Sequence, residues 1–327
     1  MNLNHLQAYC QSVSHVWGLN RTRRAVRVSR YLLRGLINPL AAFHWSSAVR
    51  SVPELQLCLT HNPRFLLKPS RHYLNRHYSF AQRAAVIASH HAVLARLLAP
   101  EQRLLLVSGQ SIRLAEIMGK RGTPYAITLC RTDKFDREGE LILGLRDSAQ
   151  QRDVFRLAFS LHATMKTLSL EIGCIQGVRS PDARELIKVA TKECHGIRPK
   201  NLLLEALMPL ARVWNVGTVF GVSNASRVYR SAATFADYDT LWSEVGGIAE
   251  AGGRFRLPLT LAHRELSEIP NHHRSEYRKR NALRSDLAEK VATTATALLR
   301  DSVERADRLW HETNRPAPKQ RPKVSLA

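Results

Sequence analysis

The stretch "SLEIGCIQGVRSPDARELIKVATKECHGIRPK", residues 169–200, joins a predicted strand to a predicted helix through a glycine turn. Leu170 and Ile172 point to one side of the short first run, which is typical of a strand. The letters "QGVRSPD" (176–182) are rich in turn formers, and the helical run after them ends at Gly196. A strand, a turn and a helix N-terminus in this order either hold an anionic cofactor or turn a structural corner.

Short apolar or alternating runs lie on both sides of this stretch and predict further strands. Because the connections between them are brief, we expect neighbouring strands to be antiparallel. The runs are "RLLLVSG" (103–109), "YAITLCRT" (125–132), "GELILGLRD" (139–147), "VFRLAFSLHA" (154–163), "VGTVFGVSN" (216–224) and "RFRLPLTL" (254–261). Helices are predicted at 182–194, 198–214 and 236–247. The pattern therefore predicts an α+β fold, in which helices pack on a mostly antiparallel sheet.

The remaining sequence divides the chain into four predicted parts. Residues 1–100 have helical spacing, and Ser79 with Gln82 three positions later predicts a capped helix that ends before Pro100. We therefore expect a basic helical N-terminal region (1–100), an α+β core domain (101–267) and a C-terminal helical segment (268–312). The tail 313–327 is rich in Pro, Lys and Arg, which predicts disorder.

The charge of the chain is strongly positive and unevenly distributed. There are 49 Lys and Arg against 27 Asp and Glu, which gives a net charge of +22. Residues 1–90 hold twelve of these cations and a single acid, Glu54, so 12 − 1 = +11 falls in this segment. Such an excess predicts attraction to polyanions, either an anionic membrane surface or nucleic acid.

The five cysteines and the apolar runs limit the class of protein. The cysteines are scattered without a CxxC pair, which argues against a disulfide framework or a zinc site and favours free thiols in a reducing compartment. The first twenty residues lack the charged start and apolar centre of a secretory signal, and no apolar run is long enough to span a membrane. We expect a cytoplasmic protein, with peripheral contact at the inner membrane as the alternative setting and with no metal site.

Several long sequence words resemble the VirK/YbjX family of proteobacterial proteins. They are "PRFLLKPSRHYLNR", "RAAVIASHH", "IGCIQG", "KVATKECHGIRPKNLLLEAL", "GVSNASRVYRS", "ADYDTLWSEVGG", "GRFRLPL" and "EIPNHHRSEYRKR", which lie between about residues 40 and 285. The resemblance implies an intracellular stress protein that supports envelope remodelling, virulence and resistance to cationic antimicrobial peptides. Some family members are linked to DNA-damage responses, so a nucleic-acid-binding factor is an alternative. The resemblance supplies no catalytic residue.

The order of the predicted elements also resembles that of N-acyltransferases, which bind acyl-CoA on a Q/R-x-x-G-x-G/A turn between a strand and a helix. Gln176, Gly177, Arg179 and Ser180 lie at the corresponding turn, although the glycine is misplaced and the second glycine is absent. A helix N-terminus with free N–H groups would suit the diphosphate of acyl-CoA. The alternative function is therefore an acyl-CoA-dependent acyltransferase of a lipid or protein amine, and the competing interpretation of the turn is a plain strand-to-helix corner.

Two further segments carry candidate residues, each with a structural alternative. His195, between two helices, is a candidate for a proton shuttle, and Arg198 and Lys200 beside it are candidates for anion binding. In the acyltransferase interpretation, Tyr229 would protonate a leaving thiolate, and Asp237 or Asp239 would deprotonate an amine. Structurally, the same residues suit a helix–helix corner, a helix cap and a solvated face.

A regular arginine pattern predicts the main anion-binding surface. The stripe consists of Arg23, Arg27, Arg30 and Arg34, at steps of four, three and four, beside an apolar face of Val28, Leu32 and Leu36. A basic amphipathic helix of this kind either lies on an anionic membrane, tracks nucleic-acid phosphates or carries its arginines into solvent.

Overall fold

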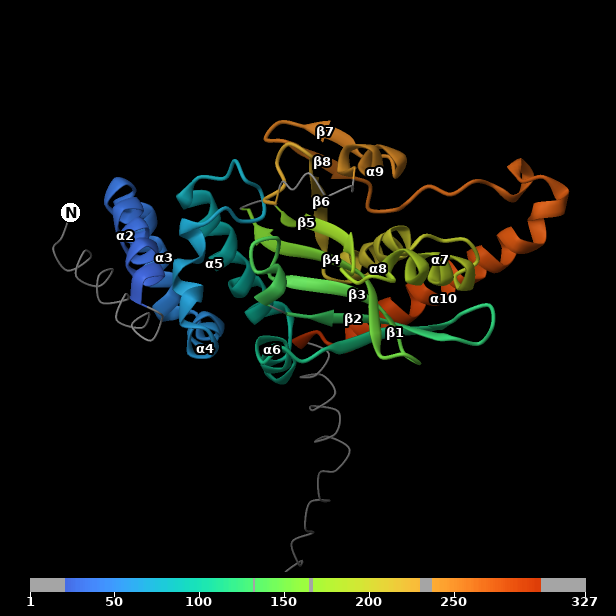
Figure 1. The fold of residues 1–327 in the computed structure, drawn as a ribbon, viewed down its shortest axis with the longest axis horizontal. Coiled ribbons are helices and arrows are strands. Elements are labelled where there is room, and N and C mark those ends of the chain that lie inside the picture. The colour runs from blue at the N-terminus through green and yellow to red at the C-terminus, as the bar shows by residue number, and fades with distance from the viewer. Residues whose placement is uncertain (1–20, 132, 165–166, 230–236, 301–327) are drawn as a thin grey trace, which may run out of the picture.

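The computed structural model describes residues 21–131, 133–164, 167–229 and 237–300. The described strands form one eight-stranded sheet in the order β1-β2-β3-β4-β5-β6-β8-β7, with helices packed against it (Figure 1). The α+β fold with a mostly antiparallel sheet is confirmed. The predicted disordered tail and the end of the predicted C-terminal segment lie outside the described residues.

The first five strands form a continuous antiparallel meander. They are β1 (Ile112–Met118), β2 (Pro124–Cys130), β3 (Leu141–Asp147), β4 (Arg152–Ala163) and β5 (Leu168–Gly177), with the 3-10 helix η3 (Asp133–Phe135) before β3. Brief connections permit this pairing, as the sequence predicted.

The sheet changes direction after β5, because β6 (Val216–Val222) pairs with β5 in parallel. A parallel pair needs a long crossover, and here it is supplied by α7 (Ala183–Glu193) and α8 (Pro199–Val213). Gly196, at φ +82°, lies in the turn between the two helices, and Pro199 opens α8. The chain continues through α9 (Tyr238–Glu244), β7 (Ile248–Glu250) and β8 (Arg254–Leu257), and β8 pairs antiparallel with β6 and β7.

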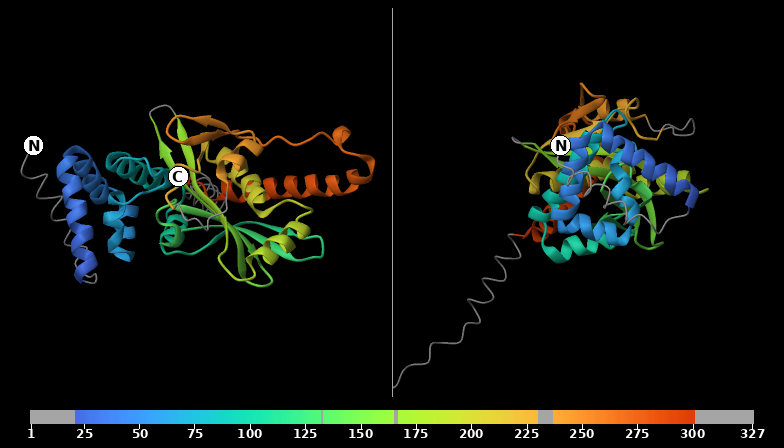
Figure 2. Two further views of the ribbon diagram at one scale, coloured as in Figure 1. Left: turned by 45° about the horizontal axis from the view of Figure 1, so that its top comes forward. Right: turned by 90° about the vertical axis from the view of Figure 1, so that its left-hand side faces the viewer.

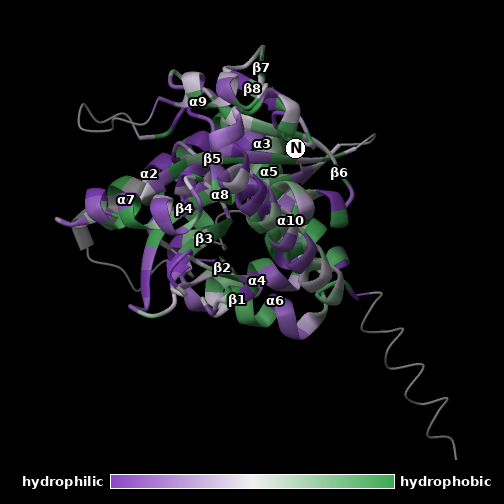
Figure 3. Cartoon of the chain, turned by 90° about the vertical axis from the view of Figure 1, so that its right-hand side faces the viewer, coloured by the Kyte–Doolittle hydropathy of each residue, from purple (hydrophilic) through white to green (hydrophobic). Residues whose placement is uncertain are grey.

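Two helices cover one face of the sheet and bury the larger core. Leu203 and Leu207 of α8 and Leu287 of α10 (Arg274–Ala297) are inaccessible to solvent and belong to one apolar cluster with Leu143 and Ile172 of the sheet. The short turns η4 (Leu266–Glu268) and η5 (Asn271–His273) lead into α10. Most helices in Figure 3 mix hydrophobic and hydrophilic residues along their length, as expected of helices that bury one side.

The N-terminal helices build a second, smaller core at one end of the molecule (Figure 2). They are α2 (Arg21–Ile37), α3 (Pro39–Ser51), α4 (Pro53–His61), the 3-10 helix η2 (Pro63–Ser70) and α5 (Phe80–Leu97). The predicted capping box is present, because the Ser79 hydroxyl accepts from the Gln82 N–H and the Gln82 side chain accepts from the Ser79 N–H. Helix α5 connects this core to the sheet.

Two expectations from the sequence are corrected, and two strands were not foreseen. The run "RLLLVSG" is not a strand but most of α6 (Pro100–Val107), because Pro100 suits a first helical turn and Gly109 provides a left-handed stop at φ +78°. Strands β1 and β7 were not predicted at all. Leu36 does not share the packed face of Val28 and Leu32, because 60% of its surface is exposed.

No helix within the described ranges is long and apolar enough to cross a membrane.

Candidate functional site

A pocket of about 520 Å³ opens beside the carboxyl ends of the two parallel strands β5 and β6. Crevices at this end of parallel strands are common ligand sites, and the volume lies in the usual range for small ligands. The lining residues come from the η3 region, β4, the β5–α7 turn, the segment after β6, and the start of α9. They are Lys134, Phe135, Glu138, Arg156, Gln176, Gly177, Val178, Arg179, Arg227, Tyr229 and Tyr238.

The pocket exists because β5 and β6 part before β5 ends. Their pairing runs from Leu168 only as far as Ile172, which pairs with Gly221. Further along β5, the N–H of Ile175 donates instead to the hydroxyl of Tyr238 at 3.1 Å. A side chain of α9 thus takes the place of a strand, and the space beyond it is available to a ligand.

Glu138 lies at the wall of this pocket with only 8% of its surface exposed. Its backbone crosses close to β5 at Gly173, where a β-carbon would overlap the Glu138 carbonyl. Burial raises the pKa of the Glu138 carboxyl to about 7, although the Cys174 thiol and the nearby Arg179 and Arg137 oppose that rise. A carboxyl group that titrates near neutral pH in a pocket suits general base catalysis.

Cys174 and Tyr238 border Glu138 but remain protonated. Burial raises the pKa of the Cys174 thiol well above its ordinary value, and the neighbouring Glu138 adds to the effect. Burial likewise raises the pKa of Tyr238, with Cys174 as a further cause. Because a reactive cysteine needs a lowered pKa, Cys174 is a core thiol and not a nucleophile.

Cations outnumber acids around the pocket, with four cationic lining residues against one carboxylate. Arg156 pairs with Asp153 and lies over the Phe135 ring, whereas Arg227 lies over the Tyr238 ring at 5.7 Å. Arg179 is exposed at the pocket rim. The pocket therefore suits an anionic ligand.

The predicted cofactor turn contributes to this pocket, but the N-terminus of the helix that follows it, α7, is not free to bind an anion. Gln176, Gly177 and Arg179 line the pocket, and Ser180 does not. Asp182 precedes α7 and forms a two-pronged ion pair with Arg152 at 2.8 and 2.9 Å. A carboxylate already lies at the N-terminus of α7, so an anion would be bound by side chains instead.

Tyr229 lines the same pocket, whereas the two predicted aspartates have structural contacts elsewhere. The Asp237 carboxylate caps α9 by accepting from the N–H and hydroxyl of Thr240, and it also accepts from the Asn224 amide. These hydrogen bonds lower the pKa of Asp237 to about 2. Asp239 accepts from the Asn224 N–H at 2.8 Å. Both aspartates thus fix the chain just before Arg227.

The basic turn between α7 and α8, which contains His195, does not belong to the pocket of Glu138. His195 has a left-handed φ of +52°, and its Nδ1 lies 3.1 Å from a carboxylate oxygen of Glu276 on α10. Lys200 pairs with Glu244 at 3.4 Å, and Arg198 is exposed immediately before α8. None of these three predicted residues lines the pocket of Glu138.

The predicted arginine stripe lies on α2. The side chains of Arg23 and Arg27 fall outside the described part of the structure. Arg30 is exposed, whereas Arg34 is half-buried and donates to the Ser70 carbonyl at 2.5 Å. Arg34 therefore also fastens α2 to η2.

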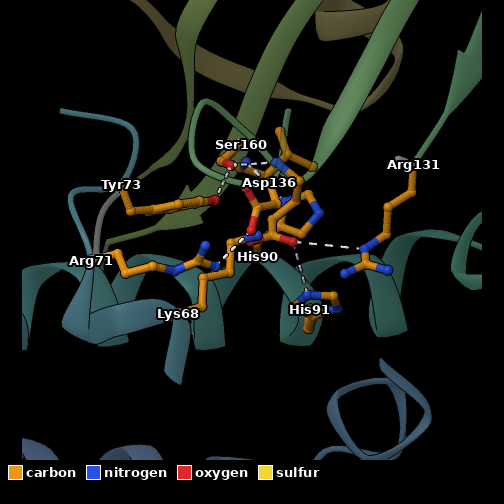
Figure 4. Close-up of polar contacts among 10 residues, drawn as sticks. Lys68, Arg71, Tyr73, His90, His91, Arg131, Asp136 and Ser160 are labelled. Carbon is orange, nitrogen blue, oxygen red and sulfur yellow. Dashed lines mark hydrogen bonds and ion pairs between the residues drawn. The ribbon is translucent and has the colours of Figure 1, made fainter. Parts of the chain in front are cut away.

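A buried ionic cluster joins the N-terminal helices to the sheet (Figure 4). Lys68 Nζ lies 2.5 Å from one oxygen of Glu140, and His91 Nε2 and Arg131 Nε lie 3.5 and 3.9 Å from the other. Burial opposes ionisation, yet Lys68, His91 and Arg131 together hold the pKa of Glu140 well below its ordinary value. The cluster has no opening to solvent at Lys68 or Glu140, so it serves to join the two parts.

Sequence reasoning missed three informative residues of the pocket, namely Glu138, Arg156 and Tyr238. Glu138 precedes a glycine in "REGE" (137–140), a pattern that resembles an ordinary polar turn. Glu138 and β5 are separated in the sequence and come together only in the folded chain, so no local pattern predicts their contact. The described ranges contain no group of His, Cys, Asp and Glu that could hold a metal ion.

Comparisons with known proteins give a family but no chemistry. The sequence model of the family described as "Protein of unknown function (DUF535)" matches residues 20–293. "Uncharacterized protein YbjX" of Escherichia coli (strain K12) is 31% identical over 278 residues, which cover 83% of this chain and 84% of that protein. No solved structure matches.

Two further relatives come from other bacteria. An "Uncharacterized protein" of Haemophilus influenzae is 27% identical over 80% of this chain and 87% of its own length. "Membrane protein LapB" of Mannheimia haemolytica is 26% identical over 59% of this chain and 81% of its own length.

Proposed function

We propose that this chain, which belongs to the DUF535 family and is similar to YbjX, is an acyl-CoA-dependent acyltransferase that serves the bacterial envelope. One observation carries the proposal: a buried carboxyl with a pKa of about 7 lies in a cation-rich pocket where two parallel strands part. The order of strands and helices around the pocket, which resembles that of N-acyltransferases, supports the same assignment.

In the proposed reaction, the pocket residues fall into two groups, those that bind the substrate and those that transfer protons. Arg179, Arg156 and Arg227 bind the phosphates of acyl-CoA, and the acyl thioester reaches past Gln176 toward Glu138. Glu138, as a carboxylate, accepts a proton from the acceptor amine, whose nitrogen attacks the thioester carbonyl carbon. The carbon–sulfur bond breaks, an amide forms, and Tyr229 donates a proton to the departing thiolate. Glu138 then releases its proton to solvent, and Tyr229 regains one from solvent.

The envelope role concerns the acceptor and the setting. A relative that carries the name "Membrane protein LapB" supports a place at the envelope. We propose that the acceptor is a lipid or protein amine there, and that the protein supports envelope remodelling, virulence and resistance to cationic antimicrobial peptides under stress. An anionic membrane surface is then the expected partner.

Ligand binding tests the pocket directly. Acetyl-CoA and a long-chain acyl-CoA should raise the melting temperature, because a ligand at 100 times its Kd adds about 2.7 kcal/mol to the free energy of unfolding. Arg179→Glu should abolish this shift. Arg184→Glu, which makes the same charge change at an exposed position of α7 outside the pocket, should retain it.

The Glu138→Gln variant separates chemistry from binding. It should bind acyl-CoA as the parent does but lose acyl transfer to an amine by about 100-fold or more, the usual effect of removing a general base. In the parent, kcat/KM should rise with pH up to about 7, as the Glu138 carboxyl loses its proton. If no acyl-CoA shifts the melting temperature of the parent, the transferase assignment is wrong.

A further inference from the structure

Helix α2 has a second apolar face that nothing covers in the described structure. Val26, Leu33, Leu36 and Ile37 of α2 and Leu40 at the start of α3 are each 57–69% exposed. They are five of the nine large hydrophobic residues that are exposed within the described ranges, and they fall within fifteen residues of the chain. Concentrated exposure of this kind marks an interaction surface.

This face lies opposite the face that packs on the protein. Tyr31 is fully buried in the N-terminal core, and Val28 and Leu32 pack against it. At 100° per residue, Val26, Leu33 and Ile37 fall on one stripe on the far side of the helix, and Arg30 flanks that stripe. Helix α2 therefore presents aliphatic side chains beside exposed positive charge.

A shallow apolar groove continues from this face. It has a volume of about 410 Å³ and runs between α3 and α5, where Leu40 and Ala41 face a row of alanines that includes Ala84 and Ala88. A flexible hydrocarbon chain suits a groove of this volume and composition.

The charges near this face indicate which kind of partner it can bind: a second copy of the chain, nucleic acid or an anionic bilayer. Glu54 is the only acid in the first 90 residues, and it is buried against Arg103. A second copy would bring arginines against arginines with no acid to pair them, so self-association is disfavoured. Nucleic acid would use the positive charge but not the exposed aliphatic side chains. An anionic bilayer uses both.

We infer that the α2–α3 face, consisting of Val26, Leu33, Leu36, Ile37 and Leu40, inserts into the interfacial layer of an anionic membrane. Arg30 contacts lipid headgroups at its edge. The inference rests on the proposed envelope role for its setting and is independent of the acyl-CoA pocket.

Vesicle co-sedimentation tests the face. The parent should bind phosphatidylglycerol vesicles and bind phosphatidylcholine vesicles much more weakly, because positive charge contributes to the attraction. The triple variant Leu33→Ser/Leu36→Ser/Ile37→Ser should lose about tenfold or more in affinity for phosphatidylglycerol vesicles, since three aliphatic side chains no longer leave water. Arg30→Gln should weaken binding less, by about fivefold.

The matched control is Leu104→Ser/Met118→Ser/Ile248→Ser, which changes three exposed hydrophobic residues elsewhere. It should bind vesicles as the parent does. Circular dichroism melting confirms that each variant is folded, and the single Arg30→Gln change provides a second test if the triple variant is unstable.

Three results would overturn the inference. The first is unchanged vesicle binding by the folded triple variant. The second is a parent that is a dimer in size-exclusion chromatography while the triple variant is a monomer. The third is a parent that binds duplex DNA more tightly than vesicles, together with a triple variant that does not bind the DNA. Melting with acyl-CoA is measured separately on the same variants. A failure of vesicle binding is thereby distinguished from a failure of the acyltransferase assignment.

Discussion

Glu171 is a buried carboxyl group that the proposed reaction does not use. It lies on β5, inaccessible to solvent, and accepts a hydrogen bond from the Tyr78 hydroxyl at 2.5 Å. His162 Nε2 lies 3.7 Å from the same oxygen. Burial raises the pKa of Glu171 to about 7, although the hydrogen bond from Tyr78 and the charge of Arg254 oppose that rise.

The raised pKa of Glu171 predicts a loss of stability as pH increases. Below about pH 4.5 the carboxyl is protonated in both the folded and the unfolded chain. Between about pH 4.5 and 7 the unfolded chain loses this proton while the folded chain keeps it, so the free energy of unfolding falls by about 3 kcal/mol. Glu171→Gln removes this contribution and should be more stable than the parent at pH 8.

Urea denaturation of both proteins at a series of pH values between 5 and 8 measures this difference. Glu138 also has a raised pKa, but it is present in both proteins, so its effect cancels in the comparison. Parallel stability curves for parent and Glu171→Gln across this range would show that Glu171 titrates normally.

At the scale of elements, the junction between α9 and β5 forms one wall of the pocket. The Tyr238 hydroxyl accepts from the Ile175 N–H, which β6 no longer reaches. Tyr238→Phe leaves that buried N–H without an acceptor and should lower the free energy of unfolding by about 1–3 kcal/mol. Tyr229→Phe is the matched control, because Tyr229 is 43% exposed, and it should change stability by less than about 0.5 kcal/mol.

Chemical denaturation of the two variants measures these changes. An equal, small effect of both substitutions would mean that the Tyr238 hydroxyl does not satisfy the Ile175 N–H. A large effect confined to Tyr238→Phe would establish α9 as the support of the open end of β5.

Elements with strong local signals were predictable, and those decided by packing were not. The capping box at Ser79 fixed the start of α5, and the alternation in β3–β5 predicted those strands. The run "RLLLVSG" is apolar without a clear period, so its helix α6 could not be distinguished from a strand. Arg179 and Tyr229 were predicted as site residues from the order of elements, whereas Glu138 depends on a backbone crossing that no local pattern encodes.

At the scale of the whole molecule, two hydrophobic cores meet across a polar seam. The N-terminal core and the sheet core are separate clusters, and the Glu140 cluster lies between η2, α5 and the sheet. The Tyr73 hydroxyl lies 2.6 Å from the Ser160 hydroxyl, and His90 Nδ1 accepts from the Leu161 N–H. Polar contacts of defined geometry therefore set how the helices sit on the sheet.

A double-mutant cycle tests this seam. Lys68→Met leaves the Glu140 carboxylate buried without its closest cation and should cost about 3–5 kcal/mol of the free energy of unfolding. The double variant Lys68→Met/Glu140→Gln removes both charges and should be less destabilised than the sum of the two single variants, by more than about 1 kcal/mol. The exposed pair Lys188 and Glu185 on α7 is the control, because the same substitutions there should show coupling below about 0.5 kcal/mol.

The coupling energy between Lys68 and Glu140 shows whether this ion pair holds the N-terminal helices on the sheet. Strong coupling at Lys68 and Glu140, together with a Lys68→Met variant in which protease cuts the N-terminal helices while the sheet resists, would show that the ion pair holds the two parts together. Coupling as weak as in the exposed control would mean that apolar packing of α5 on β4 holds the parts together without help from charge. In either case α2 is linked to the sheet through η2, because Arg34 of α2 donates to the Ser70 carbonyl and Lys68 of η2 pairs with Glu140.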